Sequence, residues 1–249
     1  MSNFKTYSNY YDLLYKDKNY KLESEYVVRK IQSFFPAAKS ILELGSGSGS
    51  HAKFLCENGF EVTGIERSEA MVSESLNKNI QGFNPIVGNI ETTILSKRFD
   101  VVISLFHVVS YLTSNDLLMQ CFNNTYTHLN ANGIFIFDVW YSPAVYFQKP
   151  ETRIKRLENS DIEVVRIAES EMITSQNVVN VNFEVLIKNK KNLQIQTLNE
   201  IHPMRHFSIP EIELLAKVSG FELLMTEEFL SGKAPSESTW GVCFIVRKV

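Results

Sequence analysis

A glycine-rich segment near residue 45 has the composition of a ligand-binding turn. Residues 41–49 have the sequence Ile-Leu-Glu-Leu-Gly-Ser-Gly-Ser-Gly, in which an apolar run predicts a buried strand that ends at the first glycine. Residues 50–58 are then expected to form a helix. Three glycines leave the turn without bulky side chains, so a ligand can approach its backbone N–H groups. The segment therefore predicts a nucleotide site.

A second signal lies at the end of the next predicted strand. Residues 61–65 are rich in apolar side chains and lead into Glu66, 17 residues after Gly49. A carboxylate at this position can accept hydrogen bonds from two ribose hydroxyls, which predicts an adenosine ligand. Residues 66–69 also have the sequence of a helix start, so a solvated Glu66 is the alternative. The order of strand, glycine turn, helix, strand and acid favours the ligand role.

The spacing of the glycines separates two kinds of nucleotide site. A dinucleotide site has the pattern G-x-G-x-x-G, but its third glycine position is Ser50 here. The pattern found instead is G-x-G-x-G, preceded by an acid at Glu43. This arrangement resembles the first motif of the class I methyltransferases that depend on S-adenosylmethionine (SAM).

The resemblance extends over nearly the whole chain. In that family an acid or amide follows the third strand, and this chain has G-N-I at 88–90. The family's fourth and fifth strands are matched by R-F-D-V-V-I-S at 98–104 and L-N-A-N-G-I-F-I-F-D at 129–138. The family usually has Asp where this chain has Asn89. The amide oxygen of Asn89 can still accept from an adenine amino group, while the N–H of Ile90 reaches a ring nitrogen.

The family resemblance implies SAM as the cofactor and a set of residues around it. Tyr15 and Tyr20 belong to an N-terminal segment that folds over the methionine end of the cofactor in similar enzymes. The alternative is that these tyrosines form a packing face. The implied cofactor residues are Tyr15, Tyr20, Glu43, Gly45, Ser46, Gly47, Gly49, Glu66, Arg67, Met71, Asn89, Ile90, Leu105 and Phe106.

Shorter motifs give a closer resemblance to bacterial nucleotide-linked amino-sugar N,N-dimethyltransferases and their glycine N-methyltransferase-like relatives. These enzymes have an aromatic N-terminal segment, matched here by residues 10–15, and an element similar to L-F-H-V-V-S-Y-L at 105–112. An acid-x-Trp pair follows their fifth strand, as in residues 138–140, and an inserted antiparallel sheet ends in a segment like residues 200–202. This resemblance implies N-methylation of a small polar acceptor, such as a nucleotide-linked amino sugar.

Four side chains near the ends of the fourth and fifth predicted strands are candidates for acceptor chemistry, because ligands bind there in open α/β sheets. Tyr111 or His107 could take a proton from the acceptor, although His107 is equally well interpreted as a packing residue. Asp138 ends an apolar strand, where burial of a carboxylate is costly without a partner, so a catalytic role is favoured. Trp140 is a candidate for contact with the substrate, with core or lid packing as the alternative.

A small basic cluster follows the predicted insertion. His202 and Arg205, with His206 beside them, are candidates for binding a phosphate or carboxylate of the substrate. A solvated rim is the alternative.

The order of predicted elements defines the fold class. Strands and helices alternate from residue 40 to residue 138, which predicts a doubly wound, Rossmann-like α/β sheet of seven strands when the final hairpin is included. Residues 150–205 lack a helical period and contain β-rich runs, so residues 143–206 are predicted to form an inserted antiparallel β subdomain. Residues 1–142 and 207–249 would then form the SAM-binding domain, with an N-terminal helical lid.

Composition limits the classes of partner. The chain of 249 residues has a net charge of −3, which provides no basic face for nucleic acid. No apolar run is long enough for a transmembrane helix, and the first residues lack a signal-peptide core. Three separated cysteines and five histidines without a metal-binding spacing predict a cytoplasmic protein with no metal site. The exposed inserted sheet could serve as a homodimer surface or as a lid.

Three other functions remain open from the sequence. The first keeps SAM but transfers the methyl group to oxygen of a small metabolite. The second is a nucleotide-binding oxidoreductase that does not use SAM, against which Ser50 argues. The third is a non-enzymatic module that senses or scaffolds through the inserted sheet.

Overall fold

The structure, a computed structural model, describes residues 13–14 and 18–249. Its elements along the chain are α2 (Tyr20–Phe34), β1 (Ser40–Leu44), α3 (Ser50–Glu57), β2 (Glu61–Glu66), α4 (Glu69–Asn77), β3 (Phe83–Val87), β4 (Phe99–Ser104), the 3-10 helix η1 (Val108–Tyr111), α5 (Asn115–His128), β5 (Leu129–Tyr141), α6 (Ser142–Gln148), β6 (Arg153–Glu158), β7 (Ile162–Ile173), the 3-10 helix η2 (Thr174–Gln176), β8 (Val178–Asn189), β9 (Ile195–Phe207), α7 (Ile209–Val218), β10 (Phe221–Glu228) and β11 (Gly241–Lys248).

Seven strands form the central sheet in the order β3-β2-β1-β4-β5-β11-β10. Strands β1 to β5 are parallel, and β11 runs antiparallel to both β5 and β10. The order reverses between β1 and β4, so the carboxyl ends of these strands border the crevice in which open α/β sheets bind ligands. The predicted doubly wound sheet of seven strands is confirmed.

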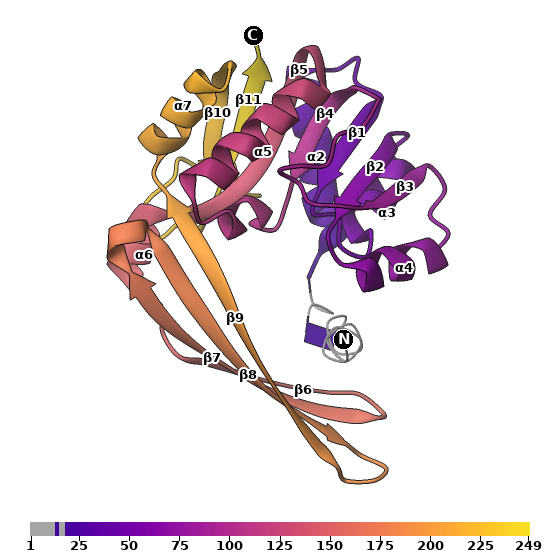
Figure 1. The fold of residues 1–249 in the computed structure, drawn as a ribbon, viewed down its shortest axis with the longest axis vertical. Coiled ribbons are helices and arrows are strands. Elements are labelled where there is room, and N and C mark those ends of the chain that lie inside the picture. The colour runs from indigo at the N-terminus through magenta and orange to yellow at the C-terminus, as the bar shows by residue number, and fades with distance from the viewer. Residues whose placement is uncertain (1–12, 15–17) are drawn as a thin grey trace.

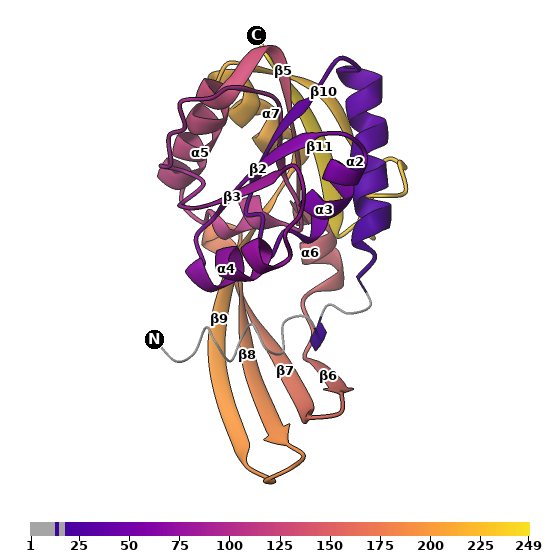
Figure 2. The ribbon, with the colours of Figure 1, turned by 90° about the vertical axis from the view of Figure 1, so that its right-hand side faces the viewer.

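Helices cover both faces of this sheet, with α5 and α7 on one side and α2 and α3 on the other (Figure 2). Alternate residues of a strand point to opposite faces, so Leu42 and Leu44 join the core under α5 and α7. Ile41 packs instead in the core under α2 and α3. Both faces of the central strands are therefore buried, which accounts for their unbroken apolar sequences.

Strand β5 is longer than its sequence pattern predicts. Residues 130–133 have turn-forming side chains, but they lie within the strand as an irregularity in which the pairing with β4 jumps from Leu129 to Ile134. Asn132 takes a positive φ of 62° there. At the other end, the strand continues past Asp138 and Trp140, so these two residues lie inside β5 and not after it.

The insertion between β5 and α7 forms an antiparallel sheet of four strands, β6 to β9, that extends away from the α/β part of the molecule (Figure 1). Helix α6 precedes it, with Pro143 in its first turn, where the missing N–H of proline is tolerated. No pattern in the sequence predicted helix α6. The last strand, β9, returns to the central sheet and pairs in parallel with β5 through Trp140 and Tyr141.

None of the helices in the described part of the chain is both long enough and apolar enough to cross a membrane.

We expect replacement of Phe122 by alanine to lower the free energy of unfolding by about 3–5 kcal/mol. Phe122 is fully buried and makes edge-to-face contacts with Phe135, Phe137 and Phe221, so the substitution leaves a cavity in the core under α5. Urea unfolding followed by circular dichroism measures the change. The matched control is Phe147→Ala, because Phe147 is 69% exposed. An equal loss of stability in both variants would contradict the expectation.

Candidate active site

A cavity of about 470 Å³ lies between the glycine turn after β1 and the inserted sheet. Its size falls in the usual range for small-molecule sites, about 300–1,000 Å³. The predicted site residues that line it are Tyr20, Gly45, Ser46, Gly47, Glu66, Met71, Leu105, Phe106, His107, Tyr111, Trp140 and His202. Residues predicted to bind the cofactor and residues predicted to act on the acceptor therefore line the same cavity.

The glycine turn has the backbone that its sequence predicts. Gly45 and Gly49 have φ values of 77° and 78°, a region that residues with a side chain rarely adopt. A Cβ atom on Gly45 would lie 2.6 Å from Cγ2 of Val108, so the turn and the segment after β4 can approach only because this side chain is absent. Gly49 caps α3, and the cavity reaches the start of that helix at Ser50 and His51.

Glu66 connects the end of β2 to the glycine turn. One carboxylate oxygen accepts a hydrogen bond from the Gly47 N–H at 3.0 Å, and the other accepts from the Ser68 N–H at 2.8 Å. Each oxygen has a second lone pair, so Glu66 can also accept bonds from ligand hydroxyls in the cavity. The same side chain thus holds the turn in place and lines the cavity.

Several predicted cofactor residues do not line the cavity. Arg67 lies just outside it, with its guanidinium 5.9 Å from the centre of the Tyr111 ring. Asn89 is exposed, and its main-chain oxygen accepts from the N–H groups of Thr92 and Thr93. Ile90 packs against the core under α5. Glu43 and Gly49 lie behind the lining residues, and Tyr15 is outside the described residues.

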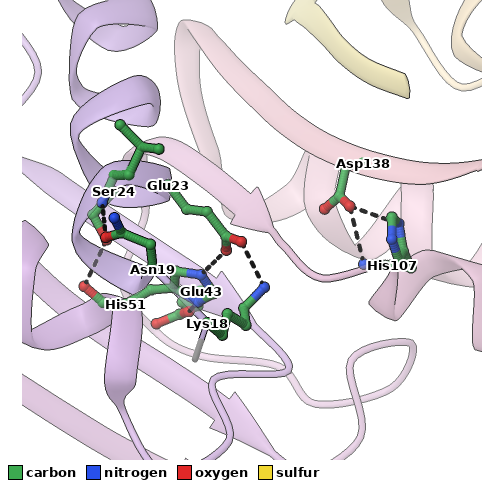
Figure 3. Close-up of polar contacts among 9 residues, drawn as sticks. Lys18, Asn19, Glu23, Ser24, Glu43, His51, His107 and Asp138 are labelled. Atoms are coloured by element: carbon green, nitrogen blue, oxygen red, sulfur yellow. Dashed lines mark hydrogen bonds and ion pairs between the residues drawn. The ribbon is translucent and has the colours of Figure 1, made fainter. Parts of the chain in front are cut away.

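A cluster of four charged or ionisable side chains lies behind the glycine turn (Figure 3). His51 is central: its Nε2 is 2.7 Å from a carboxylate oxygen of Glu23 on α2, and its Nδ1 is 3.6 Å from a carboxylate oxygen of Glu43 on β1. Lys18 contacts the other oxygen of Glu23 at 2.7 Å. Its ammonium also lies 3.6 Å from the centre of the Phe106 ring, which connects this cluster to the loop after β4.

Burial and mutual attraction shift the pKa values in this cluster. Burial lowers the pKa of His51, but hydrogen bonds and charge attraction from Glu23 and Glu43 outweigh it, and the pKa lies above its ordinary value. Burial raises the pKa of Glu23, yet His51 and Lys18 hold it below the ordinary value. Burial dominates at Glu43, whose pKa is raised. His51 is therefore stabilised as an imidazolium between two carboxyl groups.

His107, which lines the cavity, forms a second pair with Asp138, which is buried and does not line it (Figure 3). Nδ1 of His107 lies 2.7 Å from Oδ2 of Asp138, and the main-chain N–H of His107 donates to the same oxygen at 3.2 Å. Asp138 is only 1% exposed. Burial alone would raise its pKa, but attraction to His107 and these contacts hold the pKa below its ordinary value.

The loop that carries His107 has an uncommon backbone. Phe106 and His107 have φ values of 64° and 60°, in the left-handed region that costs about 1–3 kcal/mol for a residue with a side chain. A Cβ atom on Gly241 would lie 3.2 Å from Cε1 of His107, so the glycine at the start of β11 leaves space for the ring. The surrounding structure therefore fixes both the position and the orientation of the imidazole.

Tyr111 contacts the inserted sheet through a chain of side-chain contacts. Its hydroxyl lies 2.9 Å from Nδ1 of His202 on β9, and Nε2 of His202 lies 3.0 Å from a carboxylate oxygen of Glu200. Trp140 packs edge-to-face against Trp240. These contacts close the cavity between the end of β5 and the insertion.

Arg205 does not line the cavity, in contrast to His202. The two residues are three positions apart on β9, and because strand side chains alternate between faces, they point to opposite sides of the sheet. The guanidinium of Arg205 contacts Glu211 at 2.6 Å and Asn115 at 2.9 Å. His206, the third member of the predicted basic cluster, is fully buried beside Ser142. His202, Arg205 and His206 therefore do not form the predicted basic cluster.

Some cavity residues carried no signal in the sequence analysis. His51 lies in the first turn of α3, but its partner Glu23 is 28 positions away. Arg153 and Arg166 of the insertion also line the cavity. Alternation within β7 brings Arg166, Ala168 and Ser170 to one face, which is the signal that could have identified this lining.

Residues 41–133 match the family model described as a methyltransferase domain. This match identifies a methyltransferase domain within the chain, and the sheet order and the glycine turn agree with SAM as its cofactor. The predicted class and its cofactor are confirmed.

Particular proteins are similar to this chain. A crystal structure of a SAM-dependent methyltransferase from Clostridium acetobutylicum has the same fold, with a TM-score of 0.82 at 20% identity over 100% of this chain and 99% of that one. A putative methyltransferase, YqeM of Bacillus subtilis, is 26% identical over 88% of this chain and 87% of its own length. A dTDP-3-amino-3,4,6-trideoxy-alpha-D-glucopyranose N,N-dimethyltransferase of Streptomyces venezuelae is 25% identical over 56% of this chain. The chain spans 60% of that enzyme's length.

The described residues fit SAM. The glycine turn provides backbone where side chains would fill the space, and Glu66 lies at the end of β2 with accepting capacity. Oε2 of Glu43 is buried and has no hydrogen-bond partner among the described residues. A cationic ligand nearby would compensate this orphaned carboxylate oxygen.

We expect replacement of His51 by glutamine to lower the free energy of unfolding by about 3 kcal/mol below pH 6.5, because Glu23 and Glu43 lose their buried cationic partner. The folded pKa of His51 lies above its unfolded value of 6.5, so its charge stabilises the protein fully below pH 6.5. This contribution is lost as the pH rises through the folded pKa. The difference between wild type and variant should therefore shrink above pH 6.5, as measured by urea unfolding across this range.

The matched control is His128→Gln. His128 is also buried, but its ring contacts main-chain atoms of Leu95 and Asn124 and no carboxylate among the described residues. This variant should keep the pH dependence of the wild type. If the difference in the free energy of unfolding between wild type and His51→Gln does not change with pH, then His51 carries no charge in the cluster.

Proposed function

We propose that the protein transfers a methyl group from SAM to the amino nitrogen of a nucleotide-linked sugar. The observation that carries this proposal is the single cavity that runs from the glycine turn to the inner face of the inserted sheet, with His107 between them. Support also comes from the amino-sugar N,N-dimethyltransferase of Streptomyces venezuelae, to which the chain is similar.

In this proposal the glycine turn and its neighbours hold the cofactor. Gly45, Ser46 and Gly47 present backbone to it, Glu66 accepts from its ribose, and Met71 and Leu105 contribute apolar surface. Tyr20, at the start of α2, lines the same end of the cavity. When bound, SAM supplies a methyl group on a cationic sulfur, which is an electrophile that needs no further activation.

The protein's own contribution is then mostly positioning. An amine that attacks such an electrophile must be neutral, held in line and shielded from water. Phe106, Trp140 and Trp240 line the acceptor side of the cavity and limit the access of water. His107, with Nδ1 held by Asp138, has Nε2 as the ring nitrogen available to accept a proton from the acceptor.

Transfer to oxygen is a second candidate because of the same pair of residues. A hydroxyl acceptor needs a general base, and a histidine oriented by a buried carboxylate is the arrangement that provides one. We favour the amine because of the amino-sugar relatives, and the two acceptors differ in how strongly they depend on His107.

We also propose a division of labour between parts of the chain. Residues 1–142 and 207–249 would bind the cofactor, with the N-terminal segment as a lid over it. Residues 143–206 would supply the far wall of the acceptor site. The insertion contributes to the cavity from all four of its strands, β6 to β9, which supports this division.

We expect S-adenosylhomocysteine to raise the melting temperature of the wild-type protein by several degrees at saturating concentration, because it binds the folded state alone. Glu66→Ala should abolish most of this shift, since Glu66 both accepts from the ligand and holds Gly47. The control is Glu61→Ala on the same strand, where the side chain is exposed and contacts only Lys97 at 3.4 Å among the described residues. Differential scanning fluorimetry measures the shift, and its absence in the wild type would refute the proposed function.

For an amino-sugar acceptor, we expect His107→Ala to lower kcat by less than about tenfold, because positioning provides most of the rate. For a hydroxyl acceptor the loss should reach about 10²–10⁴-fold, since a general base would be removed. Release of S-adenosylhomocysteine from a panel of nucleotide-linked amino sugars and their hydroxyl analogues distinguishes the two. A large loss with the amine would contradict the positioning mechanism.

A further inference from the structure

The inner face of the inserted sheet carries two arginines at diagonal positions of neighbouring strands. On β7, Arg166, Ala168 and Ser170 share one face and line the cavity. Directly opposed residues of an antiparallel pair lie on the same face, so Arg153 of β6, which pairs with Ala168, belongs to that face too. Arg153 also lines the cavity. The acceptor side of the cavity therefore has two guanidinium groups on adjacent strands.

Arg166 is held in place without a charged partner. Its guanidinium lies 4.7 Å from the centre of the Phe183 ring, which lines the cavity as well. Its Nε is buried and has no hydrogen-bond partner among the described residues, and no ion pair is formed by Arg166 within them. Arg205, by contrast, pairs with Glu211 at 2.6 Å. A buried donor of this kind is costly unless a ligand satisfies it.

The neighbouring charges do not neutralise the two arginines. Lys155, opposite Arg166 on β6, adds a third positive charge to this face, and its ammonium donates to the main-chain oxygen of Leu14 at 2.7 Å. Glu200 contacts His202, at 3.0 Å. Glu200 does not line the cavity, and Glu151 is the acid that lines this side of it among the described residues. Positive charge is therefore in excess where an acceptor would enter.

We infer that Arg153 and Arg166 bind the diphosphate of the sugar nucleotide acceptor. This inference rests on the proposed function and adds to it the residues that select an anionic acceptor. The planar guanidinium presents N–H donors in a fork that matches phosphate oxygens, and hydrogen bonds between charged groups are the stronger ones. The expected phosphate-binding role of Arg205 thus passes to residues of the opposite face of the sheet.

The arrangement also explains what the insertion does for specificity. The glycine turn lies at one end of the cavity and the arginines lie on the sheet that closes the other end, with His107 in the part between them. An acceptor anchored by its diphosphate at the sheet would direct its sugar toward His107. A free amino sugar lacks this anchor and should bind weakly.

The test measures binding of dTDP and of thymidine by isothermal titration calorimetry, with S-adenosylhomocysteine present. We expect wild-type protein to bind dTDP at least about tenfold more tightly than thymidine, because only dTDP reaches the arginines. Arg166→Gln and, separately, Arg153→Gln should each reduce this preference, and the double variant should remove it. Raising the salt concentration should weaken dTDP binding and leave thymidine unchanged.

The matched control is Arg156→Gln. Arg156 lies on β6 between residues of the inner face, so its side chain points to the other side of the sheet, and it does not line the cavity. This variant should bind dTDP as the wild type does. Equal affinities of wild type and Arg166→Gln for dTDP, or of dTDP and thymidine for the wild type, would overturn the inference.

Binding of S-adenosylhomocysteine tests the proposed function separately from the diphosphate site. Each arginine variant should retain the thermal shift of the wild type with this ligand, which also shows that the variant is folded. A normal shift combined with no preference for dTDP refutes the diphosphate site alone. Loss of the shift in the wild type refutes the proposed function, whatever dTDP does.

Discussion

A buried carboxylate, that of Asp138, holds the centre of the site together. Its oxygen contacts both the main-chain N–H and the ring of His107, and it thereby connects β5 to the loop that follows β4. That loop has two consecutive residues of positive φ, a conformation that persists only when other contacts determine it. The contacts also make it possible to bury the carboxylate in ionised form. The position of His107 in the cavity therefore depends on its contacts with Asp138.

A second balance of charge supports the cofactor side. His51 lies between the carboxyl groups of Glu23 and Glu43, so it links α2 to β1 directly behind the glycine turn. Lys18 extends the cluster to the ring of Phe106. The cluster around His51 and the pair of His107 and Asp138 are thus connected through the loop after β4. A change on the cofactor side can therefore affect the loop that holds His107.

The periodicity of the sequence was sufficient to predict the central sheet. Apolar runs and glycine turns predicted the parallel strands, since strands such as β1 and β4 are buried on both faces. Residues 130–133 have side chains that favour a turn, but pairing with β4 on either side of the segment makes it an irregularity within β5. Helix α6 was missed because it is short and its stability comes from packing of Val145 and Ala144.

By itself, the sequence determined the doubly wound sheet, the glycine turn and the residues near the ends of its strands, because these features depend on local spacing and on the alternation of buried positions. Tertiary structure decided which charged side chains meet. Glu23 reaches His51 across 28 positions, and Tyr111 reaches His202 across 91. Strand alternation placed Arg166 in the cavity and Arg205 outside it, which depends on the register and face of the inserted sheet. Local sequence does not fix such long-range register, since the packing of distant segments selects it.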